Sequence, residues 1–203
     1  MSDTMEPHPE GKLLMTTAPI FAQGDPWTID DLERLPDDVH LQILDGSLLV
    51  SPSPTSLHQR AAHQLADQLL ERMPAELDVQ LAPGVQVKVS YLEPDVAVVR
   101  TAVADRNVKR FQADDVLLVV EVISPSNAGL DRREKPVRYA EAGIPHFWRV
   151  EIEGDRSPYV VRYGLVGGEY VELGTVWAGE EQAVDVSFPV TLRPAELTRR
   201  RRG

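Results

Sequence analysis

Two acidic residues stand at the ends of apolar runs, where their carboxylates could act together. Asp95 directly precedes the run Val96 to Val99, and Glu121 directly follows the run Val116 to Val120. Both runs have the β-branched composition that is typical of strands. If the two strands pair antiparallel, the start of the first lies beside the end of the second. The spacing therefore predicts that both carboxylates lie at the same end of one sheet.

Two carboxylates in such a place need a partner. An ionised carboxylate beside buried strands is costly unless it is paired or coordinated, and two neighbouring ones repel each other unless a cation lies between them. The chain has no cysteine, so a metal site would use oxygen or imidazole ligands, and Mg²⁺ prefers few carboxylates completed by water. We therefore expect Asp95 and Glu121 to bind Mg²⁺ or Mn²⁺. The spacing alone leaves an alternative, in which both acids are merely solvent-exposed or paired with arginine.

Composition limits the classes of protein that the chain can belong to. Its 203 residues are 42% hydrophobic and 26% charged, which is typical of one globular domain. No apolar run is long enough for a membrane span and the start has no signal pattern, so we expect a cytoplasmic protein. A formal charge of −11 opposes binding to nucleic acid. Basic residues between Arg132 and Arg138 and in the run 199–202 act against this, although the terminal run could equally be a solvated tail.

The first part of the chain has one turn signal and one short helix signal. Residues 1–26 lack apolar periodicity and are expected to form an N-terminal arm. Thr28 and Asp31 resemble an N-cap pair, which predicts a helix from Thr28 to Leu35 that stops before Pro36. Asp45-Gly46 separates two strand-like segments, so a hairpin is expected there, formed by His40–Leu44 and Ser47–Ser51.

The clearest helix signal spans Leu57 to Met73. Apolar residues recur every four positions along it, and Pro74 is expected to end it. At 100° per residue, His58 falls near the centre of the apolar face, so its side chain should point inward.

The rest of the chain alternates strands and one further helix. Within Val116–Ile123, the run Val116 to Val120 is apolar at successive positions, which favours a central strand covered on both faces. A helix is expected over Asp131–Ala142 and ended by Gly143, although Pro136 also allows a later start at that residue. Further strands are expected at Leu77–Leu81, Val85–Val89, Asp95–Arg100, Ile144–Glu151, Tyr159–Tyr163, Glu169–Leu173 and Val184–Val186, with a turn at Gly167-Gly168. This order predicts an α/β or α+β domain with a mixed sheet over residues 27–195, followed by a basic tail over 196–203.

Five segments of the chain, taken in order, are informative together. They are TIDDLERLPDDVHLQILDG (28–46), SPSPTSLH (51–58), EPDVAVV (93–99), VVEVISPS (119–126) and DRREKPVRYAEAGIPHFWRV (131–150). In this order they resemble the Uma-two family within the PD-(D/E)XK nuclease superfamily. The resemblance covers roughly residues 27–153, and its motifs are specific together rather than singly. The resemblance implies a restriction-endonuclease-like fold, in which helices flank a central mixed β-sheet.

It also implies roles for individual residues. Asp95 and Glu121 match the two acids of the superfamily motif and would ligate the metal, with the backbone carbonyl of Val122 as a further ligand. The motif's lysine should follow two residues after the second acid, where this chain has Ile123. Lys135 in the following helix matches the displaced lysine, and it would orient the attacking water and stabilise charge on the phosphoryl oxygens. An ordinary ion pair with Asp131, four residues earlier, is the alternative for Lys135.

Two further positions correspond to accessory positions of the family, and one of them carries a different residue. Gln42 stands where the family typically has a glutamate that would join the metal site, and a neutral amide there would lower metal affinity. His58 matches a family histidine and could contact the site. A lone histidine on an apolar helix face is more often a hydrogen-bonded core residue, which we favour. Three aromatic residues that match the family are expected to pack in the core, namely Tyr139, Phe147 and Trp148.

The resulting expectation is a divalent-metal-dependent DNA endonuclease that hydrolyses phosphodiester bonds with Asp95, Glu121 and Lys135. Two alternatives stay open. Ile123, Gln42 and the charge of −11 favour a catalytically weak or inactive module that binds nucleic acid or a protein. An acidic surface would also suit a metal-dependent hydrolase of a small phosphorylated molecule. We expect DNA as the partner and no membrane, and leave a homodimer open.

Overall fold

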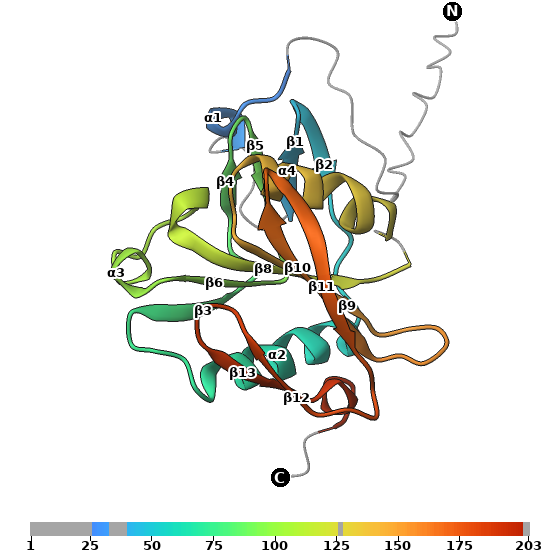
Figure 1. Cartoon of the computed structure of the whole chain (residues 1–203). Helices are drawn as coiled ribbons and strands as arrows, with labels where there is room; N and C mark the ends of the chain where they lie inside the picture. Colours follow the sequence, from blue (N-terminus) through green and yellow to red (C-terminus); the bar gives the residue numbers. More distant parts are fainter. Residues whose placement is uncertain (1–25, 33–39, 126–127, 201–203) are drawn as a thin grey trace, which may run out of the picture.

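The structure is a computed structural model that describes residues 26–32, 40–125 and 128–200. Its centre is a six-stranded sheet with helix α2 (Ser56–Leu70) on one face and helix α4 (Lys135–Glu141) on the other (Figure 1). In spatial order the strands are β11 (Glu169–Val176), β10 (Tyr159–Val166), β9 (His146–Glu151), β8 (Val116–Ile123), β6 (Val96–Arg100) and β3 (Leu77–Leu81). Only the β8–β9 pair of this sheet is parallel. The predicted mixed sheet with flanking helices is confirmed.

A smaller sheet lies on the same side as α4. It contains β2 (Ser47–Val50), β1 (Leu41–Leu44), β5 (Ser90–Leu92), β4 (Val85–Val87) and β7 (Phe111–Gln112). Apolar residues of β4 and β5 pack with Val99 of β6 and Tyr139 of α4 in one buried cluster. On the α2 side, a separate hairpin of β12 (Gln182–Asp185) and β13 (Pro189–Leu192) completes the other cluster. The large sheet is therefore covered on both faces, as the apolar run of β8 requires.

Helix α2 buries the face that the periodicity predicts. Ala61, Leu65 and Leu69 are fully buried, and the hydroxyl oxygen of Thr55 caps the helix by accepting from the backbone N–H of His58. The helix ends at Leu70 rather than at Met73, so the expected end was three residues too late.

The segment after β8 is more complex than the single helix that the sequence predicts. A π-helical turn, η2 (Leu130–Glu134), leads directly into α4, and Gly143 follows with φ of 83°. Of the two starts that the sequence allowed, Pro136 is one residue from the start of α4, whereas Asp131 is one residue from the start of the π-helical turn. Pro136 lies at the start of α4, where its missing N–H costs little. π-Turns widen the backbone and are frequent at functional sites, and this one contains the buried Asp131.

Other predicted elements can be compared directly. The hairpin at Asp45-Gly46 is confirmed, and both turn residues have the positive φ of a tight two-residue turn. Helix α1 (Ile29–Leu32) is present, and Asp31 accepts from the backbone and hydroxyl of Thr28 as the N-cap pattern predicts. Its predicted extension to Leu35 lies outside the described residues, as do residues 1–25 and 201–203. At the other end, Leu197 is fully buried in the core cluster that also contains α2.

Several short elements were not predicted. They are β5, β7, β13, α3 (Thr101–Ala104) and two 3₁₀ turns, η1 (Ala113–Asp115) and η3 (Pro194–Glu196). Strand β5 pairs with both β1 and β4, and so connects the early hairpin to the rest of the small sheet. Among the described residues, no helix is long and apolar enough to cross a membrane.

The packing of α2 predicts a graded response to truncation. Leu65→Ala should lower the free energy of unfolding by about 2–5 kcal/mol, because it leaves a cavity at a fully buried position. Leu70→Ala in the same helix should change it by about 0.5 kcal/mol or less, since Leu70 is 52% exposed. Urea denaturation measures both values. Equal losses in the two variants would contradict the packing described here.

Candidate functional site

Asp95 and Glu121 converge as the antiparallel pairing predicts. Val96 of β6 is in register with Val120 of β8, so the residue before the first strand lies beside the residues that end the second. The backbone N–H of Val122 donates to Asp95 Oδ2 at 2.7 Å. This bond holds the aspartate against β8, one residue from Glu121.

His58 adds a second contact to the same oxygen. It lies in the first turn of α2, it is buried, and its Nε2 lies 3.2 Å from Asp95 Oδ2. Burial acts to lower the pKa of His58, but the hydrogen bond to Asp95 and the charge of that residue outweigh it, and the net pKa is raised. The histidine is thus buried, as the core interpretation held, and its partner is a site carboxylate.

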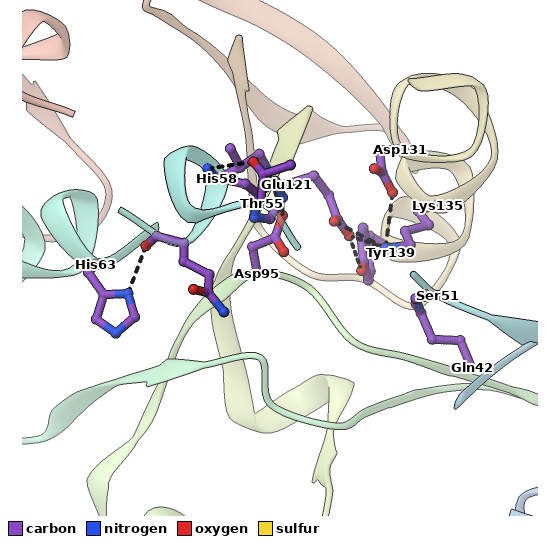
Figure 2. Close-up of polar contacts among 12 residues, drawn as sticks. Gln42, Ser51, Thr55, His58, His63, Asp95, Glu121, Asp131, Lys135 and Tyr139 are labelled. Atoms are coloured by element: carbon purple, nitrogen blue, oxygen red, sulfur yellow. Dashed lines mark hydrogen bonds and ion pairs between the residues drawn. The ribbon is translucent and has the colours of Figure 1, made fainter. Parts of the chain in front are cut away.

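Glu121 is held by two side chains of α4. Lys135 Nζ donates to both Glu121 carboxylate oxygens at 3.1 Å, and the Tyr139 hydroxyl donates to Oε1 at 2.7 Å (Figure 2). Lys135 and Tyr139 are four residues apart and so lie on the same face of the helix. All three side chains are almost fully buried. The glutamate therefore has a fixed position despite its burial.

Lys135 also contacts Asp131 in the π-helical turn. Its Nζ lies 3.0 Å from Asp131 Oδ1, and both side chains are buried. The predicted ion pair with Asp131 is therefore present, and Lys135 also contacts Glu121. One ammonium group bridges two carboxylates.

The buried cluster shifts the pKa values of its members. Burial raises the pKa of Glu121 well above its usual value and also raises that of Asp131, while the charge of Lys135 acts in the opposite direction. Burial acts to lower the pKa of Lys135, but the charges of Glu121, Asp131 and Asp95 outweigh it and raise it. The surrounding acids thus favour the ammonium form of Lys135, and the cluster contains more carboxyl groups than amino groups.

These residues line a pocket of about 110 Å³. Its wall includes Asp95, Glu121, Asp131, Lys135 and His58. The volume exceeds that of one water molecule several-fold. Its rim carries residues 51–55, which connect the early hairpin to α2.

Gln42 also lines the pocket, but its amide is already used. Its Nε2 donates to Ser51 Oγ at 2.9 Å, and its Oε1 accepts from the backbone N–H of Glu93 at 3.0 Å. Gln42 therefore connects the early hairpin to the segment that leads into Asp95. Glu93 lines the pocket too, and burial raises its pKa.

The oxygen atoms of the site fit a hard divalent cation, although only two carboxylates are placed to bind it. Both contacts of Asp95 use Oδ2, which leaves Oδ1 for a ligand. Among the described residues, Glu121 Oε2 accepts only from Lys135 and retains a lone pair. Across residues 26–32, 40–125 and 128–200, no three His, Cys, Asp or Glu side chains form a ready metal-binding group. An ion would therefore use these two acids together with water or a backbone carbonyl, such as that of Val122, which suits Mg²⁺.

The local basic residues are less available than the sequence suggested. Arg132 donates to both oxygens of Glu151, at 3.0 and 2.7 Å, and Arg138 is paired with Asp45. Lys135 is buried. Of the cluster between Arg132 and Arg138, Arg133 is exposed and makes no ion pair with any described residue. The segment from Arg132 to Arg138 therefore offers little unpaired positive charge to offset the net charge of −11.

Sequence reasoning missed two members of the site. Tyr139 was assigned to core packing, as were Phe147 and Trp148. All three are buried, but the Tyr139 hydroxyl reaches Glu121. Asp131 was considered only as an ion-pair partner for Lys135, yet it lines the pocket. The helical spacing of Asp131, Lys135 and Tyr139, four residues apart in each step, is the signal that could have grouped them.

The shared ammonium predicts strong coupling within the cluster. Lys135→Met should lower the free energy of unfolding by about 3–5 kcal/mol, because it leaves buried carboxylates without their cation. Adding Glu121→Gln should cost less in the Lys135→Met background than in the wild type, by about 0.5–3 kcal/mol. Chemical denaturation of the four proteins gives the coupling. Strictly additive losses would contradict a direct interaction.

Comparison with known proteins places the chain in a family. A family model named Uma2, described as "Putative restriction endonuclease", matches residues 29–198. Among solved structures, a protein from Anabaena variabilis described as a "putative nuclease belonging to DUF820" is similar with a TM-score of 0.66 and 15% sequence identity, over 85% of this chain and 98% of that chain. No curated protein matches the sequence. The chain belongs to the Uma2 family and has a restriction-endonuclease-like fold.

Proposed function

We propose that this protein is a divalent-metal-dependent endonuclease that hydrolyses phosphodiester bonds in DNA. The observation that carries the proposal is the convergence of Asp95, Glu121 and Lys135 on one pocket. The description of the family and that of the similar Anabaena variabilis protein support the reaction class. The identity of the ion and the activity itself are part of the proposal.

Asp95 and Glu121 would hold Mg²⁺ or Mn²⁺ through the oxygen atoms that their protein contacts leave available. When bound, such an ion supplies Lewis-acid stabilisation of the charge that develops on a phosphate. His58 and the Val122 N–H orient Asp95, and Tyr139 orients Glu121. Because these partners fix both carboxylates before any ligand arrives, little reorganisation is needed on binding.

Lys135 would act on the phosphate and its attacking water. Its ammonium group lines the pocket and stays charged, since three carboxylates surround it. A fixed positive charge aimed at developing negative charge stabilises the transition state more than the ground state. Ile123 of β8 is apolar and buried, so it cannot supply this charge. We therefore assign to Lys135 the role of the lysine that the superfamily motif carries two residues after its second acid.

Metal binding gives the first test. Wild-type protein should bind Mn²⁺ saturably in calorimetry, whereas Asp95→Ala and Glu121→Ala should lose this binding, because each removes a ligand from a site with only two carboxylates. Asp114→Ala removes an exposed acid outside the pocket and serves as the matched control. Equal binding by all four proteins would remove the basis for the site.

DNA cleavage gives the second test. Purified protein should nick or cut plasmid DNA in Mg²⁺ or Mn²⁺, and Asp95→Ala should abolish this. Lys135→Met should lower the rate constant by about 100-fold or more while Mn²⁺ affinity changes far less, since the ammonium acts on the transition state. Lys109→Met, which removes an exposed lysine, is the matched control.

Two outcomes would count against this assignment. If folded Lys135→Met protein cleaves as fast as wild type, Lys135 is a structural bridge between Glu121 and Asp131 and no more. If wild-type protein cleaves no better than Asp95→Ala with either metal and with several DNA forms, the chain is better described as a binding module with a nuclease fold.

A further inference from the structure

A second hollow lies on the side of α4 that faces away from the metal-site pocket. Its volume is about 420 Å³, and its walls come from η2, α4, β9 and the β10–β11 hairpin. We call it the aromatic groove and define it by Arg132, Arg133, Phe147, Arg149, Tyr163 and Tyr170. None of these residues has a role in the proposed metal site.

The floor of the groove is a stack of aromatic rings. Phe147 is buried, and the rings of Tyr163 and Tyr170 each stack on it with centroids 5.5 Å apart. Both tyrosines are partly exposed. The Tyr170 hydroxyl donates to the backbone carbonyl of Ile144, which fixes its ring. The floor thus presents preordered, partly exposed aromatic rings to a ligand.

Arginine side chains border this floor. The Arg149 guanidinium lies over the Tyr163 ring, 5.8 Å from its centre, so a base that stacks there would also contact this guanidinium. Arg132 and Arg149 both contact Glu151, so two cations share one carboxylate and leave an excess of positive charge. Arg133 is exposed and adds a further positive charge at the same end. Two acids also line the groove, Glu141 in α4 and Glu169 in the β10–β11 hairpin, so its positive charge is concentrated toward η2.

The groove and the metal-site pocket are lined by neighbouring residues of the chain and by neighbouring strands of the sheet. In η2, Asp131 lines the pocket, whereas the next two residues line the groove. In the sheet, Arg149 of β9 is in register with Glu121 of β8. Neighbouring strands lie about 4.8 Å apart. A single strand of nucleic acid could therefore pass from one hollow to the other around η2.

We infer that the aromatic groove binds an unpaired nucleotide of the DNA substrate, with a base stacked on Tyr163 and a phosphate at Arg133. Aromatic faces beside arginines are the usual combination for single-stranded nucleic acid, because every base has a π face and the backbone carries the charge. Paired bases are stacked on one another and cannot use such a floor. The inference rests on the proposed nuclease function and narrows its substrate to DNA that has a single-stranded stretch.

Binding of a fluorescent 12-nucleotide oligothymidylate, measured by anisotropy in the presence of a chelator, tests this inference without cleavage. Wild-type protein should bind it more tightly than a duplex of the same length. Tyr163→Ala should weaken binding about tenfold or more, as loss of a base–aromatic stack does, whereas Tyr163→Phe should bind like wild type. Arg133→Ala should weaken binding and reduce its salt dependence. Arg106→Ala, which removes an exposed charge beyond α3, should change neither.

The inference fails if folded Tyr163→Ala and Arg133→Ala bind the oligonucleotide as wild type does, if duplex binds equally well, or if wild type does not bind it. Plasmid cleavage separates this failure from failure of the proposed function. If the protein cleaves plasmid in a metal-dependent way but Tyr163→Ala leaves oligonucleotide binding unchanged, only the inference about the groove is contradicted. Oligonucleotide binding that depends on Tyr163, without any metal-dependent cleavage, would overturn the nuclease proposal and leave the groove as a nucleic-acid site.

Discussion

The region around the site depends on how one buried ammonium group is shared between two buried carboxylates. Lys135 contacts Glu121 and Asp131, and all three side chains are at most 4% exposed. Each of these charges alone would cost several kcal/mol to bury. Together they are tolerated only while α4 and η2 hold Lys135 against the end of β8. The docking of α4 on the sheet and the arrangement of the site therefore depend on the same buried side chains.

This constraint leaves the pocket with an excess of negative charge. Four acids line the pocket together with Lys135 and His58, and the pKa of Glu121 is raised because burial disfavours its charged form. A bound cation would reduce that cost, which links the physics of the fold to the proposed chemistry. Arginines near the site are also paired with acidic side chains. Arg132 and Arg138 neutralise acids of the fold, so little of the positive charge beside the site is left unpaired.

The sequence predicted the parts of the site that depend on local pattern. The apolar runs next to Asp95 and Glu121 gave both strands, and antiparallel pairing brought the two acids together. Helical periodicity placed His58 on the inner face of α2. The family resemblance pointed to Lys135, which does lie beside Glu121. In each case the relevant information lies within one element or in the pairing of two strands.

What the sequence could not predict depends on contacts between distant elements. The π-helical turn has no apolar period that distinguishes it from an α-helix, and the short strand β5 is defined by its partners β1 and β4. Tyr139 looks like any core aromatic until Glu121, 18 residues earlier, is placed beneath its hydroxyl. The amide of Gln42 is used by Ser51 and Glu93, the latter 51 residues away. Pairings over such separations require the whole fold.

The central claim is that the cluster organised by Lys135 positions Asp95 and Glu121 to hold one divalent ion. Anomalous diffraction from a crystal soaked in MnCl₂ tests it most directly, because the signal locates the metal itself. The account predicts one strong peak within about 2.0–2.4 Å of carboxylate oxygens from both Asp95 and Glu121, at distances typical of hard cations. A well-ordered pocket with no peak between these residues, while manganese is bound elsewhere on the protein, would contradict it.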